Sequence, residues 1–196
     1  MKEEAKEKII AAATELFTSK GYEKTKIDDI AKNAGLTRMM VYYYFESKQE
    51  ILSTIIKNLF KEAFKKIETT DIDLLVPNQF MGRINEVLSD KKEVVAFLMG
   101  EVLKGNMNDL TVFQFLKEFY DKIIDIFQKK KKLTLKDRNE IYINLLFFHS
   151  IPLLTFISLK DRVTMELNIE SNRLEKVFFD RFLSLLKQTI DLSLKI

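Results

Sequence analysis

The fold of this chain is decided by residues 25–48, which read TKIDDIAKNAGLTRMMVYYYFESK. The first four residues, Thr25 to Asp28, have the pattern of a capping box. In such a box the threonine hydroxyl accepts from the amide three residues on, and the acidic side chain reaches back. This pattern predicts a short helix that runs to about Ala34. Gly35 follows, and glycine readily takes the left-handed conformation in which many helices end.

A second short helix is predicted from Thr37, its N-cap, to about Phe45. Val41, Tyr44 and Phe45 are spaced at i, i+3 and i+4, so we expect them to share the inward face. The opposite face then carries Arg38, Met39, Tyr42 and Tyr43. Arginine can bind a guanine edge with two hydrogen bonds, and a tyrosine hydroxyl can bind a phosphate oxygen. The stretch therefore predicts a helix-turn-helix that reads DNA, and the alternative is a structural hairpin whose tyrosines pack against a partner.

A second capping box, Ser47 to Glu50, predicts the start of a long helix that runs to about Glu68. Lys48 lies in its first turn, where the helix dipole disfavours a cation. A DNA phosphate beside Lys48 would explain a lysine at this position. Thr25 is placed similarly, at the start of the preceding short helix. Its hydroxyl or nearby backbone amides could contact phosphates of the other DNA strand.

Apolar residues at three- and four-residue steps predict that the rest of the chain is helical as well. The first helix is expected over 3–20, with Ile9, Ala13 and Phe17 on its inner face and Gly21 at its end. Breaks are expected in a linker at 71–78, at Asp90, at Gly105-Asn106 and at Lys160-Asp161. The later helices are predicted at about 79–89, 91–104, 109–131, 134–159 and 170–194. The sequence therefore predicts an all-α fold of about nine helices.

Composition and charge exclude several classes of protein but do not by themselves identify a function. The net charge of +3 is small, and positions 1–48 carry nine lysines or arginines against eight aspartates or glutamates, so charge alone does not indicate nucleic acid. Because the chain has no cysteine and one histidine, we expect no disulfide and no metal site. The sequence also has no glycine-rich phosphate loop and no recognisable pair of catalytic carboxylates. We therefore expect neither an enzyme nor a bound cofactor.

No membrane segment is predicted. The chain begins with Met-Lys-Glu-Glu-Ala-Lys, which leads into an amphipathic helix and lacks the apolar core of a signal peptide. The longest apolar stretch, residues 145–159, is interrupted by His149, Pro152 and several hydroxyl residues. A cytoplasmic protein is therefore expected.

Several short motifs together resemble the N-terminal signature of the TetR family. They are Ala-Ala-Thr-Glu-Leu-Phe at 12–17, Gly21-Tyr22, Thr25, Ile30-Ala31, Ala34-Gly35-Leu36-Thr37, Tyr42-Tyr43-Tyr44-Phe45 and Ser47-Lys48. The resemblance covers about 45 residues and does not extend beyond about residue 55. It implies an N-terminal three-helix DNA-binding domain, here 1–47, and a larger helical ligand-binding and dimerisation domain, here 48–196. It also implies a homodimer that pairs through the last two helices, about 134–159 and 170–194.

The resemblance also assigns DNA contacts by position. Thr25 and Lys48 would contact phosphates, Tyr42 would touch the backbone or a thymine methyl, and Arg38 and Tyr43 would lie in the groove. With Thr37 and Met39 these residues form the predicted DNA-binding set. The family usually has glycine or another small residue where this chain has Met39, and a small residue where it has Met40. A methionine fills that space and could contact thymine methyls, so the operator should not be borrowed from relatives. Met40 could equally pack inward.

The second part of the chain is rich in phenylalanine, with 16 in the whole sequence. These side chains would build an ordinary helical core and dimer seam, and some of them could line an apolar ligand cavity. The candidates for that cavity are Phe97, Phe119, Tyr120, Tyr142 and His149. His149 could instead be a satisfied core histidine. Pro152 removes a helical hydrogen bond and predicts a kink near His149, which could open the cavity or merely bend the helix.

Together these features predict a ligand-responsive transcriptional regulator. The hypothesis is a repressor that binds a double-stranded operator as a homodimer and is released by a small, largely apolar molecule. The alternative is a helical homodimeric adaptor, or a DNA-associated protein, without effector-controlled regulation.

Overall fold

The computed structural model describes residues 2–68, 77–104, 111–131 and 137–193. All the regular secondary structure in these ranges is helical, as predicted. The continuous run α8–η1–α9 counts as one helix, so these ranges hold the nine helices that the sequence led us to expect. The helices are α1 (Lys2–Lys20), α2 (Ile27–Asn33), α3 (Arg38–Tyr44), α4 (Lys48–Glu68), α5 (Pro77–Ser89), α6 (Lys92–Lys104), α7 (Thr111–Lys131), α8 (Arg138–Ile143), η1 (Asn144–Ser150), α9 (Ile151–Leu167) and α10 (Ser171–Ser193).

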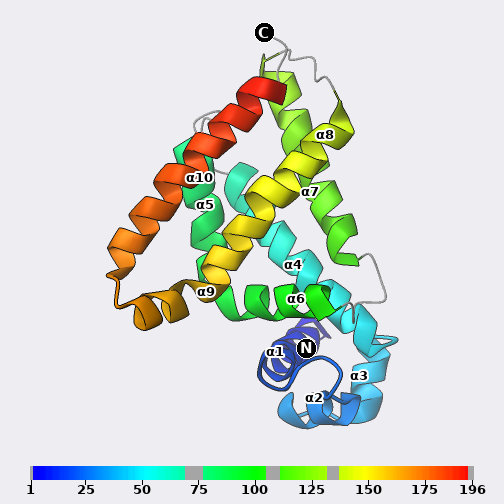
Figure 1. Ribbon diagram of the computed structural model, residues 1–196. Helices are drawn as coiled ribbons and strands as arrows, with labels where there is room; N and C mark the ends of the chain where they lie inside the picture. Colours follow the sequence, from blue (N-terminus) through cyan, green and yellow to red (C-terminus); the bar gives the residue numbers. More distant parts are fainter. Residues whose placement is uncertain (1, 69–76, 105–110, 132–136, 194–196) are drawn as a thin grey trace. The chain divides into compact units, whose positions relative to one another are not determined.

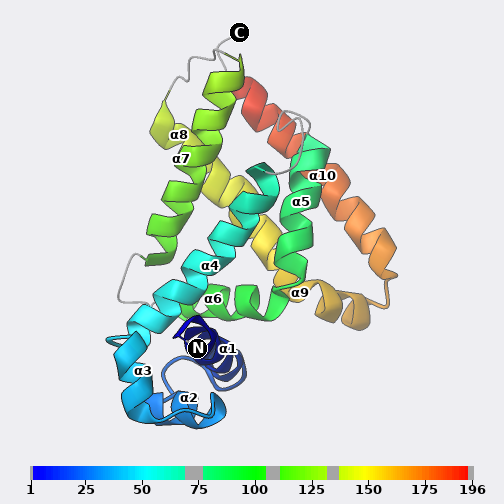
Figure 2. The same ribbon diagram turned by 180° about the vertical axis from the view of Figure 1, so that it is seen from behind.

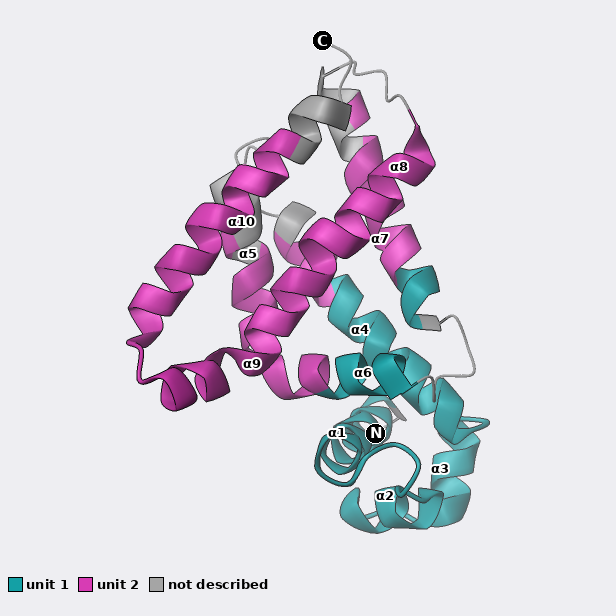
Figure 3. Ribbon diagram, viewed as in Figure 1, with its two compact units in different colours: residues 1–61, 97–115 teal, residues 62–96, 116–196 magenta. Residues whose placement is uncertain are grey.

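The chain divides into two compact units, shown in Figure 3. Unit 1 holds residues 1–61 and 97–115, and unit 2 holds residues 62–96 and 116–196. The division at 47/48 into a DNA-binding and a ligand-binding domain remains a prediction about function, which this grouping by contacts does not test. The first half of α4 is grouped with α1 to α3, and its Ile51, Leu52 and Ile56 are at most 1% exposed.

The core of unit 1 forms between α1 and the two short helices that follow it. Ile9, Ala13 and Phe17 are at most 1% exposed, which confirms the predicted inner face of α1. Ile30 of α2 and Val41 of α3 are both completely buried. Helix α2 packs on α1 and on α3, and Figure 1 shows the three grouped together.

The predicted capping box at Thr25 and Asp28 is wrong by one residue. Helix α2 begins at Ile27, and the backbone N–H of its N-cap, Lys26, donates to Asp29 Oδ2 over 3.1 Å. The physical reason is that Thr25 is 1% exposed and its hydroxyl bonds to backbone carbonyls inside the unit. Because its hydroxyl is used in these buried hydrogen bonds, Thr25 does not cap α2.

The next two helices, α3 and α4, begin at the N-cap residues that the sequence predicts. Thr37 Oγ1 accepts from the Met40 amide over 3.3 Å at the start of α3. Gly35, in the turn before it, has φ +67°, where a side chain would be strained. Ser47 Oγ accepts from the Glu50 amide over 3.1 Å at the start of α4. These local bonds set where the two helices begin.

Unit 2 is built around contacts between α5, α9 and α10. Helix α5 packs on both α9 and α10, and η1 also packs on α10. Figures 1 and 2 show α10 beside α5 from opposite sides. The buried side chains include Leu153, Ile157, Phe182 and Leu186. Phe156 of α9 stacks on Phe178 of α10 with ring centroids 3.9 Å apart.

The helix predicted to end near residue 159 is longer than expected. It runs as α8, η1 and α9 without a break from Arg138 to Leu167, and it ends at Asn168, which has φ +49°. The break predicted at Lys160-Asp161 is therefore wrong, because neither residue prevents a helix and both point their charges into ion pairs. Residues 134–136, the predicted start of this helix, lie outside the described residues.

The residues before Pro152 adopt a π-helix, η1. The Ile151 N–H donates to Leu146 O, five residues back. A wider turn here takes up the hydrogen-bonding disturbance that proline causes in a helix. The predicted breaks at 71–76 and at Gly105-Asn106 lie outside the described residues, and Pro77 and Asn78 open α5.

The helix from Arg138 to Leu167 is long and apolar enough to cross a membrane by length and composition. Its most apolar 18-residue window has mean hydropathy 1.6, and 22% of that window is buried inside the chain. Sequence inspection predicted no span because polar residues interrupt the apolar run, but an average over the window tolerates them. The same low burial leaves apolar side chains of this helix exposed, among them Phe147 and Phe148.

Candidate nucleic-acid interface

The outward face of α3 is the most exposed apolar and aromatic surface of the first four helices. Met39 is 81% exposed, Tyr43 71%, Tyr42 44% and Met40 38%. Arg38 lies beside them with 59% of its side chain exposed. We call Arg38, Met39, Tyr42 and Tyr43 the groove face. These are the four residues that the sequence assigned to the outside of the helix.

The opposite side of α3 holds the helix in place. Val41 is completely buried, and Phe45, which caps the helix, is 2% exposed. Tyr44 is half-buried, and its ring meets that of Tyr43 edge to face at 5.1 Å. The buried side therefore fixes the orientation of the groove face.

Arg38 is held on the surface by two neighbours. Its Nη1 lies 3.1 Å from Asp28 Oδ2 of α2, and its guanidinium lies 5.5 Å from the Tyr42 ring. The pKa of Arg38 is raised, first by Tyr42 and then by the charge of Asp28. The Arg38–Asp28 pair is exposed on both sides, so exchanging the carboxylate for a phosphate or a guanine edge would cost little.

Thr25 and Lys48, the two predicted phosphate contacts, bond to the backbone of the protein. The Thr25 hydroxyl donates to Gly21 O over 2.8 Å. Lys48 Nζ donates to Tyr22 O over 2.8 Å and to Thr25 O over 3.0 Å. The structure brings these two residues together with each other but gives them no place on the groove face.

The shape of this region suits double-stranded DNA. An α-helix with its side chains is about 10–12 Å wide, and the major groove is about 12 Å wide. In a helix-turn-helix the N-terminal residues of the second helix approach the base edges. Arg38 and Met39 occupy that first turn of α3.

Residues 9–55, which contain this motif, match the family model of bacterial regulatory proteins of the tetR family. This N-terminal segment of the chain is therefore similar to the DNA-binding segment of the TetR family. Among known relatives, an uncharacterised HTH-type transcriptional regulator of Bacillus subtilis, YfiR, is 26% identical over 131 residues, 65% of this chain and 64% of that protein. The biofilm operon negative transcriptional regulator IcaR of Staphylococcus aureus is 44% identical over 55 residues, 28% of this chain and 30% of that protein. The chain thus spans less than two thirds of the length of these relatives.

Solved structures extend the TetR likeness from the motif to the whole fold. A TetR-family transcriptional regulator of Syntrophomonas wolfei superposes with a TM-score of 0.70 at 19% identity, over 94% of this chain and 96% of that one. One from Streptomyces coelicolor superposes with a TM-score of 0.65 at 17% identity, over 97% of this chain and 83% of that one. At such low identity these structures support the TetR fold and nothing finer.

Three of the predicted ligand-pocket residues lie in one cluster of unit 2. Tyr120 is buried with Ile124 and Ile141, and Phe119 and Tyr142 pack against them. Burial raises the pKa of Tyr120 to about 12, so its hydroxyl stays protonated and donates to Ser150 Oγ over 2.5 Å.

Two further candidates lie outside that cluster. His149 is 5% exposed, its Nδ1 lies 2.8 Å from Asn144 O, and its ring meets Phe182 at 5.8 Å. No hydrogen-bond partner within the described part of the chain reaches its buried Nε2. Phe97 belongs to unit 1, where it stacks on Phe17 at 6.0 Å.

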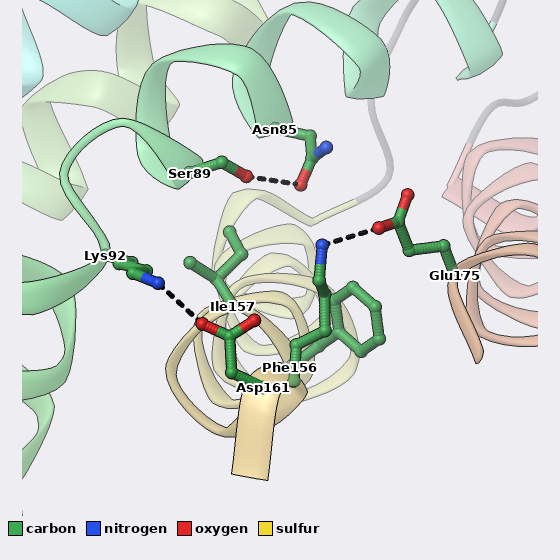
Figure 4. A pocket seen from close by; sticks show the side chains of 8 residues that line it. Asn85, Ser89, Lys92, Phe156, Ile157, Asp161 and Glu175 are labelled. Carbon is green, nitrogen blue, oxygen red and sulfur yellow. Dashed lines mark hydrogen bonds and ion pairs between the residues drawn. The ribbon is translucent and has the colours of Figure 1, made fainter. Parts of the chain in front are cut away.

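Sequence reasoning missed a small polar pocket in unit 2, drawn in Figure 4. Its volume is about 180 Å³, and two ion pairs cross it, Lys92–Asp161 and Lys160–Glu175. The remaining lining residues are Asn85, Ser89, Phe156 and Ile157. None of the predicted ligand-pocket residues lines it. No sequence signal marks this pocket, because its walls come from four separate helices.

A metal site finds no support in the ranges that the structure describes. No three histidine, cysteine or carboxylate side chains there lie close enough together to hold an ion.

Proposed function

We propose that this TetR-family chain is a DNA-binding transcriptional regulator that uses the groove face of α3 to read its operator. The observation that carries the proposal is the division of α3 into a buried side and an exposed side. The exposed side combines a cation, two phenols and a methionine, which suits base edges, phosphates and thymine methyls.

Each groove-face residue has a distinct proposed role. Arg38 forks onto a guanine after leaving Asp28. Tyr42 contacts the DNA backbone or a thymine methyl, and Tyr43 lies in the major groove. Met39, in the first turn of α3, contacts thymine methyls where the family usually has a small residue. Thr37 shapes the start of the helix through its cap on Met40.

Substitution of Arg38 and Tyr43 tests the DNA-binding proposal. Arg38→Ala and Tyr43→Ala should each weaken binding to a duplex selected from random sequence by about tenfold or more, since a good base or phosphate contact is worth roughly 1–3 kcal/mol. The measurement is a fluorescence-anisotropy titration at fixed salt, with the secondary structure of each variant checked by circular dichroism. An adaptor without DNA recognition would show the same weak binding for all three proteins.

We also propose that the chain acts as a homodimer paired through α8–η1–α9 and α10. Ile143, Phe147 and Phe148 are each more than half exposed, as is Val177 of α10. A soluble chain needs such side chains covered, and a second copy covers them symmetrically. The membrane-like hydropathy of residues 138–167 then reflects a helix of a dimer core, in a protein that works in the cytoplasm beside its DNA.

The regulatory part of the proposal is repression relieved by a small, largely apolar effector. IcaR, which resembles the N-terminal segment, is named a negative regulator. The aromatic residues Phe119, Tyr120 and Tyr142 would contact the effector. Nε2 of His149, which has no hydrogen-bond partner among the described residues, would accept a hydrogen bond from it. An effector can shift the protein only if it binds one conformational state better than the other. An effector that prefers the state unable to bind DNA should therefore lower operator affinity in a titration. DNA affinity that stays constant with every bound compound would contradict this.

A further inference from the structure

Lys48 stands at the N-terminus of α4, where two carbonyl oxygens from the turn between α1 and α2 surround its ammonium group. Nζ lies 2.8 Å from Tyr22 O and 3.0 Å from Thr25 O. The Tyr22 ring lies over the same nitrogen, 4.1 Å from it. An ammonium group has three hydrogens to donate, and two of them are taken by these carbonyls.

The turn that receives Lys48 is also held from its inner side. Thr25 is 1% exposed, and its hydroxyl donates to Gly21 O over 2.8 Å, with Leu16 O 3.2 Å away. The Tyr22 hydroxyl in turn donates to Gln49 Oε1, next to Lys48, over 2.9 Å. We call Tyr22, Thr25, Lys48 and Gln49 the clamp. It joins residues 23 to 27 positions apart in the sequence.

A lysine in the first turn of a helix is unfavourable for the isolated helix. The sequence alone therefore suggested a phosphate partner. Carbonyl oxygens carry partial negative charge, so the Tyr22 and Thr25 carbonyls remove the need for that explanation. Because these hydrogen bonds are charge-assisted and Lys48 is partly buried, releasing them to reach a phosphate would cost more than releasing an exposed lysine.

We propose that Lys48 is a positioning residue of the DNA-reading domain, which acts through the Tyr22–Thr25 turn and not by contacting a phosphate. The inference rests on the proposed DNA-binding function. The chain connects the start of α4 to α3 through Phe45, Glu46 and Ser47. The clamp connects it in addition to the turn that precedes α2. A shift of the first turn of α4 therefore moves both short helices together, and the groove face keeps its orientation relative to α2.

Three substitutions of single lysines test this role. Lys48→Met removes the ammonium and keeps the aliphatic stem. Lys48→Arg keeps a donor that can reach the carbonyls. Lys57→Met is the matched control, because it removes one positive charge from an exposed position on the same helix. Each protein is titrated with a duplex selected from random sequence and with an unrelated duplex, between about 50 and 200 mM salt.

A positioning role predicts that Lys48→Met loses about tenfold or more in affinity for the selected duplex and much less for the unrelated one, since non-specific binding follows charge. The slope of log K against log salt should stay that of wild type and of Lys57→Met. The thermal unfolding midpoint should fall by about 3–6 °C at fixed protein concentration. Lys48→Arg should recover part of both losses.

A phosphate contact predicts the opposite pattern, which would overturn the inference. Lys48→Met would then weaken both duplexes equally, lower the salt slope by about 0.9 and leave the unfolding midpoint unchanged. Failure of the proposed function looks different again. The wild-type protein would then prefer no selected duplex, while the drop in unfolding midpoint would still report the clamp contacts.

Discussion

The imidazole of His149 is a buried base with one partner. Nδ1 meets Asn144 O, while Nε2 is enclosed without a hydrogen-bond partner in the described residues. Loss of solvation lowers the pKa of His149 below 6.5, and the Asn144 carbonyl offsets only part of that effect. The ring is therefore neutral near pH 7 and leaves Nε2 as an acceptor. Under the proposed function this atom accepts a hydrogen bond from a hydroxyl or amide of the effector.

The protonation of His149 predicts a pH dependence of stability. Its folded pKa is depressed, so the unfolded chain takes up the proton first as the pH falls below about 6.5, and the free energy of unfolding then decreases. Above that pH the contribution is fully present. For this one group the slope cannot exceed about 1.4 kcal/mol per pH unit.

Urea denaturation of wild type and His149→Gln between about pH 8 and pH 5 measures this slope. The variant should lose stability less steeply than wild type below pH 6.5. Parallel curves for the two proteins would mean that His149 is protonated equally easily in both states, against the burial described for it.

At the scale of secondary-structure elements, α3 is a helix of seven residues that depends on its surroundings. An isolated helix of this length does not form in water. The Thr37 cap, the left-handed Gly35 before it and the buried Val41 supply what the helix lacks. The long run α8–η1–α9 depends instead on a π-turn that accommodates Pro152. In α3 the cap and the buried side chain compensate for the short length of the helix, and in the long helix the π-turn accommodates Pro152.

Removing the Thr37 cap should weaken α3. Thr37→Ala should lower the free energy of unfolding by about 1 kcal/mol, because the Met40 amide loses its acceptor at the helix start. Thr37→Ser keeps the hydroxyl and serves as the matched control. Equilibrium urea unfolding measures the difference. Equal stability of the alanine and serine variants would show that the cap contributes nothing in the folded protein.

At the scale of the whole molecule, the exposed apolar side chains of α8–η1–α9 and α10 carry the proposed dimer interface. Phe147 is 58% exposed and Phe148 54% exposed in one chain, on a helix whose window is only 22% buried. Side chains of this kind are covered by a partner, by lipid or by a second copy. The TetR fold and the proposed function favour the second copy.

A charge placed in that surface should separate the proposed dimer. Phe148→Glu should raise the dissociation constant of the dimer by about 700-fold, since an unpaired carboxylate would be buried at about 2 kcal/mol in each copy, roughly 4 kcal/mol per dimer. Asn58→Glu adds the same charge at an exposed position of α4 and is the control. Sedimentation equilibrium measures the constant. A variant that remains dimeric like wild type would place the interface elsewhere.

Features governed by neighbours in the sequence could be predicted. Helix periodicity and caps act over three or four residues, so the two faces of α3, the Gly35 turn and the starts of α3 and α4 follow from residues 25–50. The wrong break at Lys160-Asp161 and the misplaced box at Thr25 arose where ion pairs and burial, set by distant residues, overrode the local signal. Among the predicted pocket residues, Tyr120 and Tyr142 share one cluster, while Phe97 belongs to the other unit.

The sequence by itself determined that α3 has an exposed face of Arg38, Met39, Tyr42 and Tyr43, because a short helix with one buried stripe leaves no other arrangement. The tertiary structure alone decided what Lys48 and Thr25 bond to. The partners of Lys48 come from the turn between α1 and α2, up to 26 residues away, and those of Thr25 from that turn and from the end of α1. A charge pattern cannot distinguish a backbone carbonyl from a phosphate as the acceptor for an ammonium group. Only the folded positions of the atoms make that distinction.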